Sequence, residues 1–394
     1  MNTTNKRILV VSIGDPNTRA AWSGTPYYAY KELRERFDNL ELVSTPKLDR
    51  VIDFAGRFAR LIGIDIRFEP WVREIYSRIV DRHIKKLKPN VLVSIGATYK
   101  VCDIKSSIPI IHVSDALFCT ITGYYRNYRG LSARTRRTGR DSQQSLLGKD
   151  TWLLLTSDWA KEEAEKSYVV DPQRVLVNPI GANVDGSVRA RSDEHHKTLK
   201  MLFVGKDWER KGGGILIDVF KVIKTSLPDA QLDIVGCDPA EARNIQGVTI
   251  HGFLDKAKVQ ELRKLRELFD SASFFAMLSI EEAFGLVYCE AAAFGLPSLA
   301  MKTGGVPTIV RDGETGLLFE IESSPHDIAD RVLRLWADRE SYEAMRIEAR
   351  NRFDSVLNWS VWGNRIESKI ARIVTNEGRV GMPVAVQSEL GTVQ

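Results

Sequence analysis

Residues 279–320 read SIEEAFGLVYCEAAAFGLPSLAMKTGGVPTIVRDGETGLLFE, and this stretch decides the fold class. It follows the apolar run SFFAML (273–278) and contains a second one, LPSLAM (296–301). Continuous apolar runs are typical of strands that are buried on both faces of a parallel sheet. A helical segment separates the two runs, so the stretch predicts a strand–helix–strand unit of an α/β fold.

The same alternation extends over most of the 394 residues and predicts two doubly wound, Rossmann-like parallel-sheet domains. It is interrupted near 183–199, where the sequence is polar and charged without an apolar period. Further buried strands are expected at 7–13, 91–95, 109–113, 151–156, 201–205 and 232–236. The predicted organisation is an N-terminal domain (1–185), a linker (186–199), a C-terminal domain (200–358), a C-terminal helix packing back towards the N-terminal domain (359–376) and a mobile tail (377–394).

Composition and cysteine usage are ordinary for a soluble globular protein, with 43% hydrophobic and 27% charged residues. There is no run of about 18 apolar residues that would predict a transmembrane helix. The first apolar run is too short for the core of a signal peptide. Four cysteines lie far apart without a C-x-x-C motif, which favours reduced thiols and a cytoplasmic location.

Charge is unevenly distributed along the chain. Residues 1–190 contain 30 Lys and Arg against 21 Asp and Glu, whereas the remainder contains 26 against 30. The helical segment 71–87, the basic stretch IKKLK (84–88) and the loop RNYRGLSARTRRTGR (126–140) favour an N-terminal domain that docks on an anionic membrane or binds a lipid-linked acceptor. A simple solvated surface explains the same charges, so both interpretations stay open at this point.

Two glutamates stand out in the first-quoted stretch. Glu282 follows a predicted strand, and Glu290 lies about a turn into the helix that begins near Gly285, in an apolar sequence. A buried carboxylate is costly unless it is hydrogen-bonded or paired. Carboxylate oxygens accept hydrogen bonds from hydroxyls, which suits the vicinal diols of a sugar or a ribose. The alternative is a pair of surface acids on an amphipathic helix.

A basic loop follows the first strand of the second domain, in the sequence LFVGKDWERKGG (202–213). Lys206, Arg210 and Lys211 precede two glycines that open a helix. Cations beside a helix N-terminus favour phosphate oxygens, because charge-assisted hydrogen bonds to them are strong. The loop therefore predicts an anion site, with a solvated basic turn as the alternative.

The first domain contains two weaker signals. Gly24 lies in the loop WSGTP (22–26), which opens a helix and offers backbone N–H groups to a phosphate, although a plain strand–helix turn reads the same. His112 ends the strand PIIHV, where open α/β sheets place ligands, but a buried hydrogen-bonded histidine is equally compatible. Asp115 is interpreted as the N-cap of the following helix.

The segment EAFGLVYCEAAAFGLP (282–297) closely resembles the E-x7-E signature of retaining glycosyltransferases of family 4, written E-G-F-G-L-x-x-x-E-A-x-A-x-G-x-P. These enzymes have the GT-B fold, in which two Rossmann-like domains face each other across a cleft. The resemblance covers about 7–375 and is most specific over 279–317. Three positions depart from the family pattern: Ala283 replaces a glycine, Lys206 replaces an arginine, and the first loop lacks a Gly-Gly pair.

The resemblance implies a role for each candidate residue. Glu282 and His112 are implied to contact the donor sugar at the catalytic centre, Glu290 the ribose, and Phe253 the base. The diphosphate is implied to meet Lys211, with Lys206 or Arg210 as a second cation, together with Gly24 and the backbone N–H groups of Phe284, Gly285 and Leu286.

The resemblance further implies retaining transfer of a hexose from a UDP- or GDP-linked sugar to a glycan or lipid-linked acceptor, in cell-surface polysaccharide or glycoconjugate synthesis. No D-x-D motif occurs, so we expect neither a metal nor another cofactor, with Lys and Arg supplying the charge. The alternatives are a nucleotide-sugar epimerase of GT-B-like fold and a non-catalytic sugar-nucleotide sensor. The arginines of 126–140 raise nucleic-acid binding, but no recognition fold accompanies them, so no nucleic acid is expected.

Overall fold

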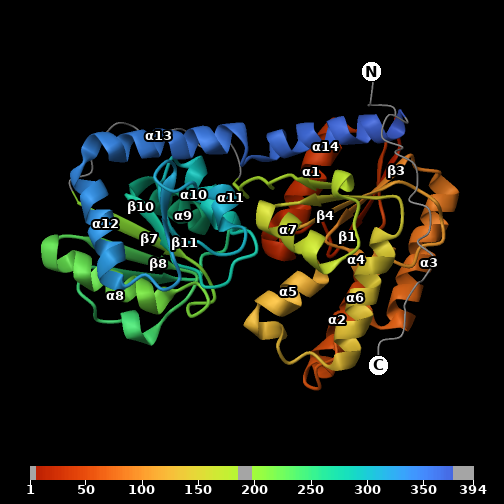
Figure 1. Cartoon of the computed structure of the whole chain (residues 1–394), viewed down its shortest axis with the longest axis horizontal. Helices are drawn as coiled ribbons and strands as arrows, with labels where there is room; N and C mark the ends of the chain where they lie inside the picture. The colour runs from red at the N-terminus through yellow and green to blue at the C-terminus, as the bar shows by residue number, and fades with distance from the viewer. Residues whose placement is uncertain (1–5, 185–197, 376–394) are drawn as a thin grey trace, which may run out of the picture.

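A computed structural model of the chain describes residues 6–184 and 198–375. Two α/β lobes lie side by side, and two helices near the C-terminus run along one side of both (Figure 1). Residues 186–197 of the predicted linker and the whole predicted tail (377–394) lie outside the described residues.

The first lobe contains a six-stranded parallel sheet in the order β2-β1-β3-β4-β5-β6. Its strands are β1 (Ile8–Ser12), β2 (Leu40–Leu42), β3 (Val91–Ile95), β4 (Ile110–Ser114), β5 (Thr151–Leu155) and β6 (Val175–Val177). Its helices are α1 (Thr25–Arg36), α2 (Pro46–Arg60), α3 (Pro70–Leu87), α4 (Thr98–Val101), α5 (Phe118–Tyr124), α6 (Ala133–Leu147) and α7 (Asp158–Ser167).

The second lobe repeats this architecture with the order β12-β11-β10-β7-β8-β9. Its strands are β7 (Lys200–Val204), β8 (Gln231–Val235), β9 (Val248–Gly252), β10 (Phe274–Met277), β11 (Ser298–Met301) and β12 (Gly316–Phe319). The helices that follow the first strand are α8 (Gly213–Ser226), α9 (Val259–Ser271), α10 (Leu286–Ala293), α11 (Val306–Ile309), α12 (Pro325–Ala337), α13 (Arg339–Ser355) and α14 (Trp359–Val374).

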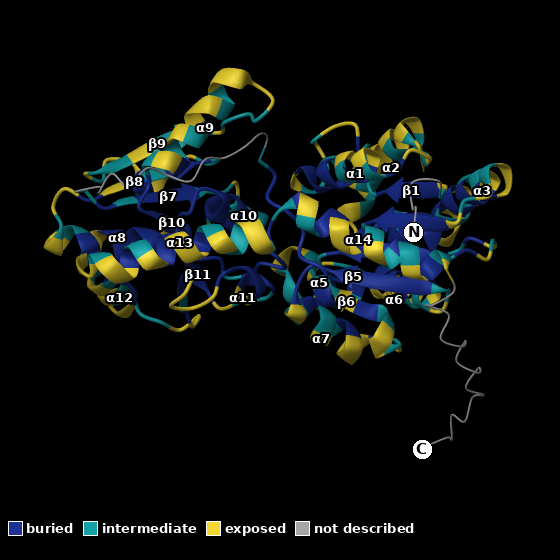
Figure 2. Ribbon diagram, turned by 90° about the horizontal axis from the view of Figure 1, so that it is seen from above, coloured by how far each residue is buried: buried dark blue, intermediate teal, exposed yellow. Residues whose placement is uncertain are grey.

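All sheet pairings are parallel, and helices cover the sheets, so strand residues are buried while the outer faces of the helices are exposed (Figure 2). In β1, β3, β4 and β5 every residue is buried, which explains the continuous apolar runs of the sequence. The predicted fold class of two Rossmann-like doubly wound domains is confirmed. The basic segment 126–140, expected as a loop, instead contains the first half of α6.

Helix α14 belongs to the second half of the sequence but packs on α1 of the first lobe. Trp359 stacks on Tyr28, with ring centroids 6.2 Å apart. Arg36 of α1 donates to the backbone carbonyl of Ser360 at 3.0 Å and pairs with Glu367 at 3.0 Å. The C-terminal helix thereby fastens the second half of the chain to the first lobe. None of the helices described here combines the length and apolar character that crossing a bilayer requires.

Candidate active site

The two lobes meet where segments after β4 of the first lobe contact segments after β10 of the second. The N–H of Glu282 donates to the hydroxyl of Tyr124 at 2.8 Å, and the N–H of Ala283 donates to the hydroxyl of Tyr125 at 2.7 Å. Parallel sheets place ligands at the carboxyl ends of their strands, so this junction is the candidate site.

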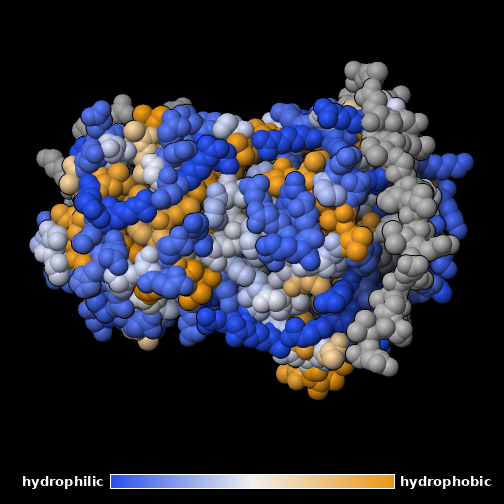
Figure 3. All heavy atoms as spheres, in the orientation of Figure 1, coloured by the Kyte–Doolittle hydropathy of each residue, from blue (hydrophilic) through white to orange (hydrophobic). Residues whose placement is uncertain are grey.

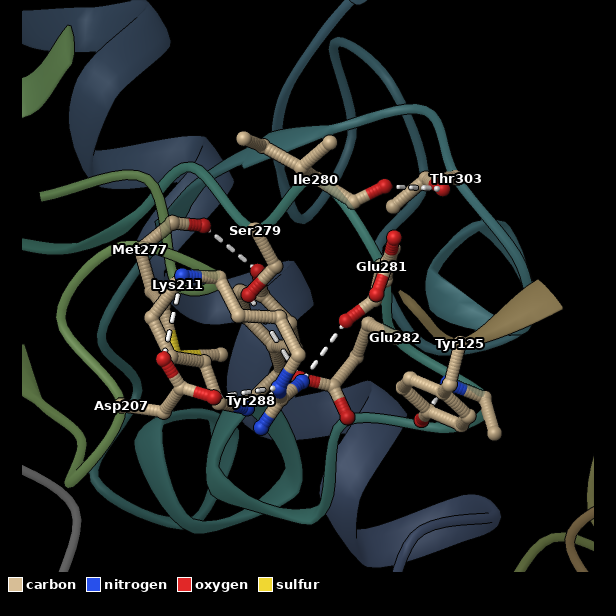
Figure 4. A network of polar contacts seen from close by, with 12 residues as sticks. Tyr125, Asp207, Lys211, Met277, Ser279, Ile280, Glu281, Glu282, Tyr288 and Thr303 are labelled. Atoms are coloured by element: carbon tan, nitrogen blue, oxygen red, sulfur yellow. Dashed lines mark hydrogen bonds and ion pairs between the residues drawn. The ribbon is translucent and has the colours of Figure 1, made fainter. Parts of the chain in front are cut away.

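Glu282 is the centre of a polar network at this junction (Figure 4). Its residue is only 8% exposed, and its carboxylate pairs with Lys211. Arg210 Nη1 lies 3.7 Å from Glu282 Oε2, and the hydroxyl of Ser279 donates to the same oxygen at 3.4 Å. Figure 4 shows Lys211 on one side of Glu282 and Tyr125 of the first lobe on the other. Two cations therefore stabilise a carboxylate that burial alone would disfavour.

A glycine loop fixes the backbone that presents Glu282. The N–H of Gly305 donates to the carbonyl of Glu282 at 3.1 Å, and a Cβ on Gly304 would collide with that carbonyl. Gly304 also has φ +48°, which side chains other than glycine rarely adopt. Close approach of the two loops explains why two glycines follow β11.

Glu290 lies on α10 and is 3% exposed. Lys256, in the loop between β9 and α9, donates to Glu290 Oε1 at 2.5 Å. Packing of the apolar helix α10 does not require a buried acid, so the pair of Glu290 and Lys256 indicates a polar site. Sequence reasoning missed Lys256, because only the fold brings residues 34 positions apart together.

The start of α10 supplies further donors. Gly285 caps the helix in a left-handed conformation (φ 94°). Within the described part of the chain, the N–H groups of Phe284, Gly285 and Leu286 have no hydrogen-bond acceptor. The first N–H groups of a helix lack partners inside the helix and carry partial positive charge, so these three groups can receive an anion.

The structure distinguishes the two candidate second cations. Arg210 lies with Lys211 at the junction, donates to the carbonyl of Glu281 at 2.7 Å and has its guanidinium 5.6 Å from the ring centre of Tyr125. Lys206 points elsewhere: its ammonium lies 4.5 Å from the ring centre of Phe253, which is 59% exposed in the loop after β9. The side chains of Arg210 and Lys211 are thus grouped, and those of Lys206 and Phe253 form a second pair.

The loop predicted around Gly24 has an unusual backbone. Trp22, Ser23 and Gly24 all have positive φ angles, of 43°, 54° and 87°. The Nδ2 of Asn183 donates to the carbonyl of Ser23 at 2.7 Å, and Asn183 accepts from the indole of Trp359 at 3.0 Å. Such backbone strain persists only where the surroundings impose it and is frequent at functional sites.

The same loop leads to a carboxyl that sequence reasoning assigned only to helix capping. The indole N–H of Trp22 donates to Asp115 Oδ2 at 3.0 Å. Asp115 does not cap α5, whose N-cap is Leu117. Burial, with a smaller contribution from the negative charge of Glu282, raises the pKa of Asp115 to about 6. A carboxyl of the first lobe therefore lies within electrostatic range of Glu282.

His112 is placed differently from the expectation of a sugar contact. The ring is 1% exposed inside β4, and its nitrogens lie 3.0 Å from the hydroxyl of Ser94 and 3.2 Å from that of Thr98. Burial lowers the pKa of His112 to about 4, so the ring is neutral. In this conformation His112 is a hydrogen-bonded histidine of the lobe core. Asp115, at the end of the same strand, is the ionisable group nearer the junction.

Comparison with known proteins agrees with this architecture. Residues 186–352 match the family described as "Glycosyl transferases group 1". That segment contains the basic loop, both glutamates and the glycine loop after β11. The matches to this family and to the relatives below support the class of a glycosyltransferase with the GT-B fold.

Two relatives illustrate the sequence similarity. A D-inositol 3-phosphate glycosyltransferase of Corynebacterium glutamicum is 26% identical over 289 residues, which cover 68% of each chain. The enzyme of the same description from Streptomyces scabiei is 32% identical over 208 residues, covering 47% of this chain and 46% of the relative.

Solved structures share the fold over nearly the whole chain. Sucrose-phosphate synthase from Thermosynechococcus elongatus has a TM-score of 0.67 at 17% identity, covering 94% of this chain and all of that one. Anabaena HepE, in complex with UDP and glucose, has a TM-score of 0.63 at 13% identity, covering 93% and 99%. WaaG, a glycosyltransferase involved in lipopolysaccharide biosynthesis, has a TM-score of 0.60 at 15% identity, covering 92% and 99%.

Proposed function

We propose that the protein is a retaining, metal-independent glycosyltransferase that moves a hexose from a UDP- or GDP-linked sugar to a glycan or lipid-linked acceptor. The observation that carries the proposal is the arrangement around the start of α10. Glu282 and Glu290, each buried and each paired with a lysine, flank three N–H groups that have no acceptor among the described residues. The two glutamates can accept hydrogen bonds from hydroxyls, and the N–H groups between them can donate to phosphate oxygens. This order matches that of a nucleotide sugar, in which a diphosphate joins the ribose to the hexose.

In this proposal Glu290 accepts hydrogen bonds from the ribose hydroxyls, and Lys211 with Arg210 holds the diphosphate. In this proposal the N–H groups of Phe284 and Gly285 donate to the same diphosphate oxygens. Negative charge on the diphosphate grows as the sugar–phosphate bond breaks, so fixed cations and dipoles stabilise the transition state more than the ground state. The arginine and lysine supply the charge that a metal ion supplies in some other sites that bind a diphosphate.

Binding of the donor also changes existing ion pairs. Lys211 pairs with Glu282, and Lys256 pairs with Glu290. A diphosphate that attracts Lys211 releases an oxygen of Glu282 for the sugar hydroxyls. We propose that Lys256 likewise moves aside for ribose or contacts the nucleotide itself. These exchanges keep each carboxylate partnered throughout, which avoids the penalty of an unpaired buried charge.

The acceptor approaches from the first lobe. Asp115 and the loop containing Trp22 and Gly24 border the junction from that side, and Asp115 is proposed to orient the acceptor hydroxyl. Retention of configuration follows if the acceptor attacks from the face that the diphosphate leaves, with a phosphate oxygen taking its proton.

Contacts of Tyr124 and Tyr125 with the loop of Glu282 hold the lobes together and limit water, which would otherwise hydrolyse the donor. A cytoplasmic location and a role in cell-surface glycan synthesis remain parts of the proposal.

Thermal-shift titration tests the donor site. UDP, GDP, ADP and their glucose, mannose and galactose conjugates are added to wild type and to Glu290→Gln, with Glu322→Gln as an exposed control acid. A true donor raises the melting temperature by mass action. We expect the shift at a fixed donor concentration to shrink in Glu290→Gln and to persist in Glu322→Gln. No stabilisation by any nucleotide, or equal stabilisation of both variants, would refute the site.

A second measurement distinguishes transfer from the alternatives. Incubation of the stabilising nucleotide sugar without acceptor should leave its sugar configuration unchanged by NMR, apart from slow hydrolysis. An epimerised sugar would favour the epimerase, and binding without turnover of any tested acceptor would favour a sensor. UDP sugars are the first to test, because the similar HepE structure holds UDP and glucose.

A further inference from the structure

An apolar patch on the first lobe is left uncovered. Val51, Phe54 and Phe58 of α2, with Leu61 and Ile62 directly after it, are 63%, 63%, 62%, 83% and 71% exposed. We call these five residues the apolar knob. They account for five of the thirteen large hydrophobic side chains that are exposed in the described part of the chain. Single exposed apolar residues are ordinary, but a contiguous group marks an interaction site.

Helix α2 does not need the knob to hold its place. Its inner side buries Ile52 in a cluster with Ile66, Val72 and Tyr76 of the first lobe. Val51, Phe54 and Phe58 follow at spacings of three and four, so they share the outer face of the helix, and Leu61 and Ile62 continue the patch into the turn after it. Phe54 and Phe58 contact each other edge to face, with ring centroids 5.4 Å apart. Folding therefore explains the inner face, and the outer apolar face requires a partner.

Arginines surround the knob. Arg50, Arg57 and Arg60 of α2 are exposed. The N–H of Ser132 donates to the carbonyl of Gly63 at 2.8 Å, so the start of α6 lies beside the turn that carries Leu61 and Ile62. That start adds exposed arginines at positions 129, 134, 136 and 137. The acidic groups nearby are fewer: Arg134 pairs with Glu69, Arg137 lies 3.9 Å from Asp141, and Asp53 of α2 is exposed. The surroundings of the knob still carry a clear excess of positive charge.

We infer that the apolar knob inserts into the interface of an anionic lipid bilayer while the neighbouring arginines contact lipid phosphates. An apolar helix face with basic flanks is the usual composition of a helix that lies in a membrane interface. The charge complementarity selects an anionic bilayer as the partner. Figure 3 shows an apolar group projecting at the lower edge of the molecule, where Figure 1 places α2.

The docking surface is connected to the candidate site by one short segment. Arg126 pairs with Glu281 at 3.0 Å, next to Glu282, and Ser132 contacts the turn that carries the knob. A membrane bound by the knob therefore lies along the same lobe that borders the junction. The assignment of a lipid-linked acceptor rests on the proposed function, whereas binding of the knob to lipid does not.

The surface shares segment 126–140 with the one that the sequence suggested, but not the basic stretch 84–88. The basic stretch 84–88 ends α3, an 18-residue helix about 27 Å long. The beginning of α3 follows the 3₁₀ turn Ile66–Phe68, which packs against α2. The lysines of 84–88 consequently lie at the far end of α3 from the knob, and the arginines of α2 and α6 are the cations of the docking surface.

Vesicle flotation tests the inference on the full chain. Wild type is mixed with phosphatidylcholine vesicles with or without phosphatidylglycerol and compared with the double variant Phe58→Ser/Leu61→Ser. The control is Val259→Ser/Ile347→Ser, which removes two exposed apolar residues of the second lobe. We expect wild type and control to float with anionic vesicles and the knob variant to bind about tenfold or more weakly. Because all four side chains are exposed, melting temperatures should be unchanged.

The charge component has its own pair of variants. Arg57→Gln/Arg60→Gln should weaken binding to anionic vesicles, and Arg263→Gln/Lys264→Gln on α9 should not. High salt should weaken wild-type binding, since it screens exposed charges.

Equal flotation of the knob variant and wild type, or no flotation of wild type with either vesicle, would overturn the inference. So would a wild-type dimer that the knob variant dissociates, because it would identify a second copy as the partner. Nucleotide-sugar thermal shifts in the knob variant separate this failure from failure of the proposed function, which predicts that they persist.

Discussion

The two lobes share one topology and present their polar groups in different ways. In the second lobe, Glu281, Glu282 and Glu290 are buried, and each is paired with a cation. Around the first lobe's docking surface, arginines stay at the surface beside exposed apolar side chains. Buried pairs are rigid and suit a ligand of fixed shape, whereas exposed cations suit a fluid or variable partner. Under the proposed function, the same fold provides one lobe for the nucleotide and another for the acceptor and its surroundings.

The sharpest test of this division is Glu282→Gln. Loss of the charge should lower kcat/KM for transfer about 10²–10³-fold, because an interaction with the reacting sugar is strengthened in the transition state. Binding of the free nucleoside diphosphate should not weaken, since that ligand contains no hexose and the variant no longer competes for Lys211. Enzyme assay and calorimetry measure the two quantities separately, and Glu322→Gln is again the control. Parallel losses of both would break the assignment of Glu282 to the sugar.

Arg210→Gln compared with Lys206→Gln tests which cation accompanies Lys211. The grouping of Arg210 with Lys211 predicts a loss of about 10–100-fold in kcat/KM for Arg210→Gln, in the range of one charged hydrogen bond. Lys206→Gln should lose less than about fivefold. A reversed order would mean that Lys206 leaves Phe253 when the donor binds.

Asp115→Asn tests the contribution of the first lobe to chemistry. Its pKa of about 6 predicts that transfer rises with pH until that carboxyl is ionised, so wild type should show a limb near pH 6 that the variant lacks. The variant should lose about tenfold in kcat at neutral pH.

The same carboxyl affects stability. Because the pKa of Asp115 is raised in the folded state, the stability of wild type falls as pH rises from about 4 to about 6 and stays lower above it. The amide oxygen of the asparagine can still accept the hydrogen bond from the indole of Trp22, but it carries no charge. The melting temperature of the variant at pH 7 should therefore exceed that of wild type. An unchanged pH profile would remove Asp115 from the mechanism.

The smallest effect is expected at the contact between lobes. Tyr125→Phe removes the acceptor of the Ala283 N–H, and a net hydrogen bond contributes about 1 kcal/mol. Transfer should fall a few-fold, with a rise in donor hydrolysis relative to transfer if the contact excludes water. Product analysis with and without acceptor gives this ratio. An unaltered ratio would limit Tyr125 to a structural role.

The sequence allowed more of the second lobe's site to be predicted than of the first. Glu282, Glu290 and Lys211 lie in local patterns of strand, glycine and helix, so their spacing already indicates a common edge. The bonds of Trp22 with Asp115 and of Tyr125 with Ala283 join residues 93 and 158 positions apart. No local period specifies such pairs.

Other differences between the expected and the observed structure also have physical causes. Strand β9 lies at one edge of its sheet and has no buried residue, so its sequence lacks a continuous apolar run. Strand β12, at the opposite edge, is mostly buried but only four residues long. His112 was expected at the donor sugar because its strand ends at the ligand edge. In this structure its ring is buried beside the hydroxyls of Ser94 and Thr98, and its contact with the sugar stays a prediction. The exposed outer face of α2 was not predicted, because its apolar residues alternate with the buried ones along a single helical stretch of sequence.

Helix α14 also connects the two lobes close to the loop of Gly24. The chain passes from α13 to α14 through 356–358, and the N–H of Ala182 donates to the carbonyl of Leu357 at 2.9 Å. Directly after this segment, the indole N–H of Trp359 donates to Asn183, whose Nδ2 donates to the carbonyl of Ser23. Residues 356–358 therefore join the second lobe to a hydrogen-bonded linkage that runs through Trp359 and Asn183 to the left-handed loop of the first lobe. We expect a displacement of this junction to reach the Gly24 loop through that linkage.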